Sequence, residues 1–171
     1  MTPAPPSASP PSPLAHAKTD EEVLATWDTM ALLRPHLGRG AYLAAVRRMM
    51  ASGYRLAVAA EAGAVLAVAG YRIVETLYGG RTLVVDDLVT AAASRSAGHG
   101  GRLLRALREH AAREGCTQVH LDSGVQRTRA HRFYIREGFS VVGLHFVADT
   151  RMPETCSTER DSQADSASGR Q

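Results

Sequence analysis

The stretch from Tyr54 to Thr90 constrains the fold more than any other part of this sequence. It reads YRLAVAAEAGAVLAVAGYRIVETLYGGRTLVVDDLVT, in which β-branched and small apolar residues are interrupted by EAG and by YGG. Short glycine-containing interruptions between such runs are typical of hairpin turns. The stretch therefore predicts three consecutive antiparallel strands, a meander, in the middle of the chain.

The segment before the meander predicts a short edge strand and two helical stretches. The strand is expected near residues 14–17, and the helical stretches over 19–33 and 41–51, separated by RPHLGRG. Thr19 and Glu22 have the spacing of a capping box, in which each side chain accepts a hydrogen bond from the other's backbone N–H. The first helix is therefore expected to begin at this pair.

The segment after the meander predicts alternating helices and strands. We expect a helix over 98–115, a strand over 117–122, a helix over 128–138 and a closing strand region over 139–148. The complete order suggests an α/β domain with a mixed, mostly antiparallel, twisted sheet flanked by helices.

The two ends of the chain differ in composition from the part between them. Residues 1–13 are rich in Pro, Ser and Ala, and residues 152–171 are rich in small polar residues. Such segments bury too little apolar surface to offset the entropy lost on ordering. We therefore expect two disordered tails around a single domain over residues 14–151.

Charge and cysteine content exclude several classes of protein. The formal net charge is +3 and no run of lysine or arginine concentrates it, which argues against a nucleic-acid partner. No apolar run is long enough to span a bilayer, and no secretory signal is visible. Cys116 and Cys156 suggest neither a disulfide framework nor a thiolate metal site. We expect a cytoplasmic protein without a membrane partner and without a metal.

The sequence SRSAGHGGRLLRAL, from Ser94 to Leu107, follows the last strand of the meander. A helix start offers unpaired N–H groups and a partial positive charge, and glycines let a ligand approach the backbone closely. The loop therefore has the composition of a pyrophosphate-binding cradle. A strand-to-helix turn that needs its glycines only for packing has the same composition.

A dinucleotide-binding fingerprint is a further interpretation of the same loop. Gly98 and Gly100 supply its first two glycines, and Asp122 would bind the ribose. The third glycine position is occupied by Leu103, and the chain that remains is too short for a doubly wound domain. These two departures disfavour a dinucleotide site.

Two motifs together resemble the GNAT superfamily of N-acetyltransferases. Residues 95–100, RSAGHG, match its R/Q-x-x-G-x-G/A loop, with VDDLVT before it and GRLLRAL after it. AHRFYIREGF, about forty residues further on, is similar to its second signature, A-x-x-F-Y-x-x-x-G-F. The element order agrees over roughly residues 14–149. Ser96 stands where many relatives have a glycine, Ala92 where a proline is common, and Arg127 where an asparagine is common.

The resemblance implies a GNAT-type fold that binds acetyl-CoA as co-substrate. The strand before the loop would pair its backbone with the pantetheine arm, the loop would hold the pyrophosphate, and Arg127 would reach a CoA phosphate. The cofactor-binding residues implied in this way are Leu88, Val89, Thr90, Arg95, Ser96, Ala97, Gly98, His99, Gly100, Gly101 and Arg127. For His99, a packing role is an equal alternative.

The resemblance also implies which groups move protons. Tyr134 occupies the position of the general acid that protonates the leaving thiolate; alternatively, it packs on an amphipathic helix. Asp86 and Asp87 are candidate bases for the attacking amine, with Glu75 as a further carboxylate of the meander. Because side chains alternate along a strand, at most one of Asp86 and Asp87 is expected to face the substrate.

Two other arrangements of titratable residues stay open. His120 and Asp122 share one strand face and would form a base and its orienting partner, or a structural hydrogen bond. A zinc site from His120, Asp122 and His131 is conceivable, although no ligand motif supports it.

The expected activity is acetyl-CoA-dependent N-acetyl transfer to a primary amine by direct attack on the thioester. The acceptor is a small-molecule or peptide amine of unidentified structure, and a homodimer is compatible with the resemblance. The alternative is a catalytically silent GNAT-fold module that binds CoA or a partner.

Overall fold

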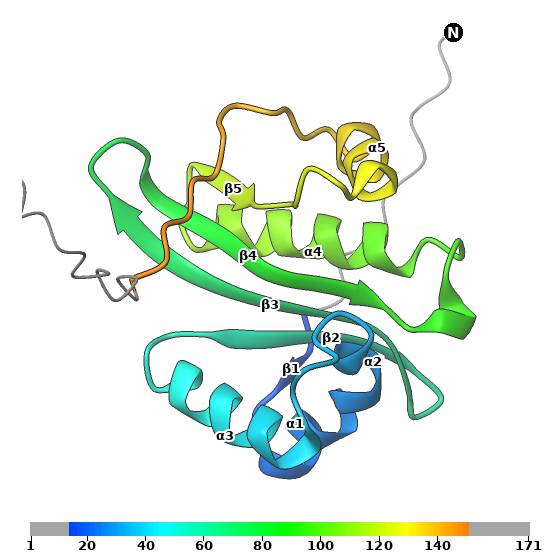
Figure 1. The fold of residues 1–171 in the computed structure, drawn as a ribbon. Coiled ribbons are helices and arrows are strands. Elements are labelled where there is room, and N and C mark those ends of the chain that lie inside the picture. Colours follow the sequence, from blue (N-terminus) through cyan, green and yellow to red (C-terminus); the bar gives the residue numbers. More distant parts are fainter. Residues whose placement is uncertain (1–13, 151–171) are drawn as a thin grey trace, which may run out of the picture. The chain divides into compact units, whose positions relative to one another are not determined.

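The computed structural model describes residues 14–150, and the two expected tails lie outside these described residues. The chain divides after Ser140 into two units, which are described separately. The first unit contains these elements (Figure 1): β1 (His16–Ala17), α1 (Asp20–Ala25), α2 (Trp27–Ala31), α3 (Arg39–Met50), β2 (Arg55–Glu61), β3 (Ala64–Thr76), β4 (Gly80–Thr90), the 3₁₀ helix η1 (Ala92–Ser94), α4 (His99–Arg113), β5 (Gln118–Leu121) and α5 (Thr128–Arg136).

The five strands form one sheet in the order β1-β2-β3-β4-β5. The pairs from β1 to β4 are antiparallel, and β4 pairs with β5 in parallel. The meander of β2, β3 and β4 and the short edge strand β1 are therefore confirmed. Ala62 and Gly63 both have positive φ in the first hairpin turn, which explains why EAG interrupts the apolar run there.

Helices cover both faces of this sheet (Figure 1). One core lies between the sheet and α1, α2 and α3, and it includes Val23, Met30 and Val46. The other core lies between the sheet and α4. Leu107 and Ala111 of α4 are buried there, as the helical spacing of the apolar residues predicted. None of the helices in the described part of the chain combines the length and apolar character that crossing a membrane requires.

The first helix begins at the predicted capping box and is shorter than predicted. The Glu22 amide donates to Thr19 Oγ1 at 3.2 Å, and the Thr19 amide donates to Glu22 Oε2 at 2.9 Å. The expected continuous helix is instead two short helices, because α1 ends at Ala25 and α2 begins at Trp27. At the junction, the buried Thr26 hydroxyl donates to the carbonyl of Val23 at 2.7 Å.

A β-bulge in β4 determines which side each of its residues faces. Gly70 of β3 lies opposite Asp87, but the next residue, Tyr71, lies opposite Val85, so Asp86 is an extra residue in β4. Regular alternation would place Asp87 on the same face as Val85. The bulge turns Asp87 to the opposite face, toward α1–α3, while Val85 packs in the core beside α4.

The closing strand predicted over 139–148 is absent: the structure has no strand between Phe139 and Thr150. Residues 141–150 belong to the second unit, and no neighbouring strand hydrogen-bonds to them there. A run such as VVGLHFV has β propensity, but propensity depends strongly on the surface against which a strand packs. The predicted strand is therefore wrong, because the described residues provide no neighbouring strand with which it could form hydrogen bonds.

The bulge brings Gly70 against a buried tyrosine, and this contact is testable. A Cβ atom at Gly70 would overlap the hydroxyl and ring of Tyr54. Because Tyr54 is buried, we expect Gly70→Ala to lower the free energy of unfolding by about 1–3 kcal/mol, measured by urea denaturation.

Gly40→Ala is the matched control, because Gly40 lies in α3 and a Cβ atom there would have no neighbouring atom within 4 Å. It should leave stability unchanged or raise it by up to about 1 kcal/mol. Equal effects of the two substitutions would contradict the packing described for Gly70.

Candidate active site

Strands β4 and β5 part from each other halfway along β4. Their parallel pairing ends where Val85 lies opposite Leu121, whereas β4 continues to Thr90 paired with β3 alone. Beyond Val85, the edge of β4 that faces β5 therefore has no strand partner among the described residues. The residues expected to pair with the pantetheine arm lie on this part of β4, where only the edge toward β5 is unpaired. They are Leu88, Val89 and Thr90.

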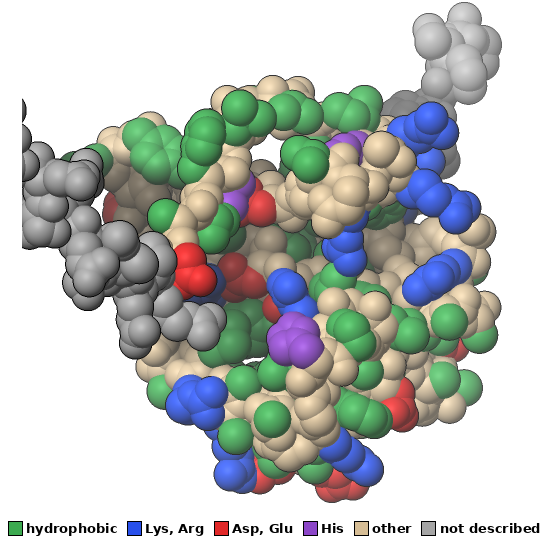
Figure 2. Space-filling model, in the orientation of Figure 1, with side chains coloured by type: hydrophobic (Ala, Val, Ile, Leu, Met, Phe, Trp, Pro, Cys, Tyr) green, Lys and Arg blue, Asp and Glu red, His purple; other side chains and the backbone are tan. Residues whose placement is uncertain are grey.

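A cleft of about 320 Å³ opens where the two strands part. Leu88, Asp86, Arg127 and Tyr134, all expected in the site, line it together. On the face drawn in Figure 2, acidic and basic side chains lie side by side in a hollow. Arg34, which the sequence did not single out, is also part of the wall.

Tyr134 lies on α5 with its ring half-buried. Its centroid is 5.3 Å from that of Phe133 and 6.1 Å from that of Phe139, so part of the ring packs as the alternative interpretation expected. Burial raises the pKa of Tyr134 above its ordinary value, and the positive charge of Arg127 partly opposes this. The hydroxyl of this cleft-lining residue is therefore protonated at neutral pH.

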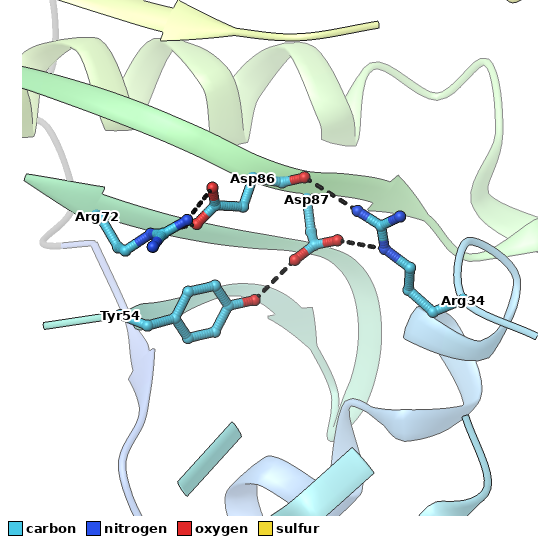
Figure 3. A network of polar contacts seen from close by, with 5 residues as sticks. All are labelled: Arg34, Tyr54, Arg72, Asp86 and Asp87. Carbon is cyan, nitrogen blue, oxygen red and sulfur yellow. Dashed lines mark hydrogen bonds and ion pairs between the residues drawn. The ribbon is translucent and has the colours of Figure 1, made fainter. Parts of the chain in front are cut away.

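The two neighbouring aspartates have different surroundings (Figure 3). Asp86 lines the cleft and accepts two hydrogen bonds from Arg72, at 2.9 and 2.8 Å. Asp87 lies behind the wall, with 10% of its side chain exposed. Its Oδ1 accepts from Arg34 Nε at 2.8 Å, and its Oδ2 accepts from the Tyr54 hydroxyl at 2.9 Å. Of the two, only Asp86 lines the cleft.

The glycine loop connects the open edge of β4 to α4. Ser96 has φ of +66° and Gly98, the N-cap of α4, has φ of +79°. No side chain caps this helix, so its first-turn N–H groups keep their hydrogen-bonding capacity for a ligand. The first intrahelical bond runs from the Arg102 amide to the carbonyl of Gly98 at 2.9 Å. This arrangement fits a bound anion.

Two of the glycines also serve packing. A Cβ atom at Gly100 would lie 3.0 Å from Thr90 Oγ1, and one at Gly101 would lie 2.8 Å from Glu137 Oε1, just beyond α5. The packing interpretation of the loop is thus correct for Gly100 and Gly101. It does not compete with ligand binding, because side-chain packing leaves the backbone N–H groups unused.

Arg102 adds a positive charge that sequence reasoning missed. Its guanidinium donates to the Ala97 carbonyl at 3.1 Å and lies 2.7 Å from Nδ1 of His99. Because Arg102 is three residues after His99 on the same helix, the spacing alone would have brought the two together. His99 therefore contributes to the loop through this contact.

The histidines of the alternative arrangements have polar contacts of their own. His120 Nε2 lies 2.8 Å from Gln118 Oε1, and its ring stacks on Tyr78. His131 Nε2 lies 3.0 Å from the carbonyl oxygen of Gly124. Within residues 14–150, no group of three His, Cys, Asp or Glu residues is arranged to hold a metal ion.

Comparison with known proteins identifies relatives that match most of this chain. The family model described as "Acetyltransferase (GNAT) family" matches residues 27–139. A curated protein of Bacillus subtilis (strain 168), "Uncharacterized N-acetyltransferase YhdJ", is 34% identical over 128 residues, which cover 74% of this chain and 90% of that protein.

Solved structures with the same fold agree. A putative acetyltransferase from Agrobacterium tumefaciens str. C58 has a TM-score of 0.68 and 26% identity, over 78% of this chain and 96% of that one. The aminoglycoside N-acetyltransferase AAC(6')-Iy, solved in complex with CoA, has a TM-score of 0.69 over 87% of this chain and 100% of that one. At 17% identity, the second likeness shows the fold alone. The predicted mixed α/β fold is confirmed.

The loop geometry predicts opposite effects for two substitutions. Gly98→Ala places a Cβ atom in the left-handed region and should cost about 1–2 kcal/mol of stability. Ser96→Gly relieves the same strain and should leave stability unchanged or raise it by up to about 1 kcal/mol, after the entropy of a new glycine is counted. Urea denaturation of both variants measures this. Equal losses in both would contradict the left-handed conformation at Ser96.

Proposed function

Because this chain belongs to the acetyltransferase (GNAT) family, we propose that it transfers the acetyl group of acetyl-CoA to a primary amine bound between β4 and β5. The observation that carries the proposal is the cleft itself. An unpaired strand edge, a protonated tyrosine and a carboxylate meet there, and the glycine loop follows directly on the same strand. Acceptors under this proposal are small-molecule or peptide amines.

The loop and the strand edge are proposed to bind acetyl-CoA. The N–H groups from Ser96 to Gly101 would hold the pyrophosphate, with Arg95 and Arg102 adding positive charge. The open edge of β4, from Leu88 to Thr90, would hydrogen-bond the pantetheine arm as an added strand does. The uncapped start of α4 supports this, since its N–H groups need an acceptor.

Transfer requires two proton movements around one exchange of bonds. The amine nitrogen attacks the thioester carbonyl, a C–N bond forms, and the C–S bond breaks with its electron pair on sulfur. A backbone N–H of the open strand edge would stabilise the charge that develops on the carbonyl oxygen. Tyr134 would donate its hydroxyl proton to the sulfur and regain one from solvent.

The attacking amine must lose a proton, and Asp86 is the proposed acceptor. It lines the cleft, whereas Asp87 is buried behind the wall. Arg72 holds the Asp86 carboxylate through both oxygens and so fixes its position. Asp87 is a positioning residue under this proposal.

Tyr134→Phe tests the general acid. Loss of the proton donor should lower kcat by about 100-fold, because general acid catalysis commonly contributes at least that much. Thiol release from acetyl-CoA with a panel of amines measures kcat, and calorimetry with CoA should show an unchanged affinity. Tyr78→Phe is the control, since Tyr78 is exposed in the β3–β4 turn.

The same assay separates the enzyme from the silent module. Thiol release that depends on an added amine supports the transferase, whereas CoA binding without any transfer would establish the silent module. Unchanged turnover in Tyr134→Phe would reject the acid role and leave the transferase intact.

Asp86→Asn tests the proton acceptor. Without a base, only amine that is already neutral in solution reacts, so kcat/KM should fall by about 100-fold near neutral pH and recover as pH approaches the pKa of the acceptor. Glu75→Gln is the control, because Glu75 lies on β3 outside the cleft. A pH-independent loss in Asp86→Asn would mean that the carboxylate only shapes the wall.

A further inference from the structure

Arg34 lies on the wall of the cleft, shortly after α2, with 44% of its side chain exposed. Its Nε–H donates to Asp87 at 2.8 Å, and Nη2 donates to the backbone carbonyl of Asp86 at 3.4 Å. A long, exposed arginine side chain is ordinarily mobile, but these bonds fix the guanidinium on the backbone of β4.

The partner that fixes Arg34 is itself held from behind. Asp87 is buried and accepts the Tyr54 hydroxyl at 2.9 Å, and the Tyr54 ring lies over Gly70, where no Cβ atom fits. Burial and the charge of Asp87 raise the pKa of Tyr54, so the hydroxyl keeps its proton and donates. Successive contacts from Gly70 through Tyr54 and Asp87 therefore hold Arg34 in place.

The way in which Arg34 is held leaves its outer edge available. A guanidinium has five N–H donors, and the bonds to Asp87 and Asp86 use the Nε side and one hydrogen of Nη2. These two bonds use neither hydrogen of Nη1 nor the other hydrogen of Nη2. In Figure 3, one terminal nitrogen of Arg34 points away from both aspartates. The bond to Asp87 does not use this outer edge of the guanidinium. The outer edge has the fork geometry that binds a carboxylate or a phosphate.

The charges around Arg34 define what would bind there. Asp86, on the same wall, is the carboxylate proposed to receive the proton of the amine, and Arg34 donates to its backbone. A cation and a carboxylate next to each other complement a ligand that carries an ammonium and an anionic group.

We propose that Arg34 binds an anionic group of the acetyl acceptor, so that the acceptors of this protein are amines that also carry a carboxylate or a phosphate. This inference rests on the proposed transferase function. An arginine that is already immobilised loses little entropy on binding, which favours recognition at this position.

Matched pairs of acceptors test the inference with the unaltered protein. Glycine and methionine are compared with their amides, and phosphoethanolamine with ethanolamine, with rates corrected for the fraction of neutral amine. We expect kcat/KM to be about 10- to 100-fold higher for the anionic member, as a hydrogen-bonded charge pair provides. The first comparison reports a carboxylate and the second a phosphate. Equal rates within both pairs would overturn the inference while the transferase stands.

Variants then assign the preference to a residue. Arg34→Gln should abolish the preference, mainly through a higher KM for the anionic member of each pair. Arg34→Lys keeps a charge without the fork and should retain part of the preference. Arg48→Gln, at an exposed arginine of α3, should change nothing. Thermal unfolding shows whether each variant is folded. If Arg34→Gln is unfolded, Arg34→Lys alone tests whether Arg34 causes the preference.

Two other results would overturn the inference. A preference that survives in both Arg34 variants, or that disappears in Arg127→Gln instead, would place the anion elsewhere in the cleft. Absence of thiol release with every amine would reject the proposed function, and this inference with it.

Discussion

An extra residue in β4 determines where the polar groups of the site lie. Because Asp86 has no partner on β3, the alternation of side chains shifts by one, and Asp87 turns toward the α1–α3 core. An unpaired carboxylate in such a place would cost several kcal/mol, so its partners must come from the helical side. Tyr54 satisfies one oxygen from within, and Arg34 satisfies the other from the edge of the cleft. The bulge thus buries the Asp87 carboxylate, and the need to pair this carboxylate holds Arg34 in place on the cleft wall.

The same strand provides the backbone side of the site. β4 pairs with β3 from Gly80 to Thr90 apart from the bulge at Asp86, but with β5 only as far as Val85, so the second half of β4 has one free edge. That edge runs directly into the glycine loop, where uncapped N–H groups and Arg102 make the start of α4 electropositive. Under the proposed function, a ligand with an extended polar arm and a diphosphate would find unpaired backbone groups both along this edge and at the start of the helix. Gly100 and Gly101 allow α4 and α5 to pack closely beside it.

What the sequence predicted well was local, and what it missed depends on contacts between distant residues. The capping box at Thr19, the hairpin turn at Ala62–Gly63 and the apolar face of α4 each follow from neighbours within a few positions. The two motifs placed the loop and Tyr134 on the correct elements. The bulge at Asp86 leaves no mark in the composition of β4, since it arises from register against β3.

Arg34 was missed for the same reason: it lies 53 positions before Asp87, in a stretch that reads as a helix connection. The prediction of a closing strand was wrong for a different reason. The sequence there has a β-prone pattern, but the described residues provide no neighbouring strand for it to pair with. For Asp86 and Asp87, the sequence predicted one feature correctly and missed another. Alternation correctly limited the cleft to one of them, yet the face that Asp87 adopts is set by the bulge rather than by simple alternation.

Two ion pairs lie at the wall of this cleft. Arg72 compensates Asp86 and Arg34 compensates Asp87, so these four side chains together contribute little net charge. Their long-range attraction for a charged acceptor is therefore small, and under the inference above affinity would depend on donors and acceptors that are already in position. A guanidinium held by a buried carboxylate is such a donor, since the orientation of its outer N–H groups is fixed before any ligand arrives. Under the inference above, the Arg34–Asp87 pair would contribute to specificity through geometry, although Asp87 partly compensates the charge of Arg34.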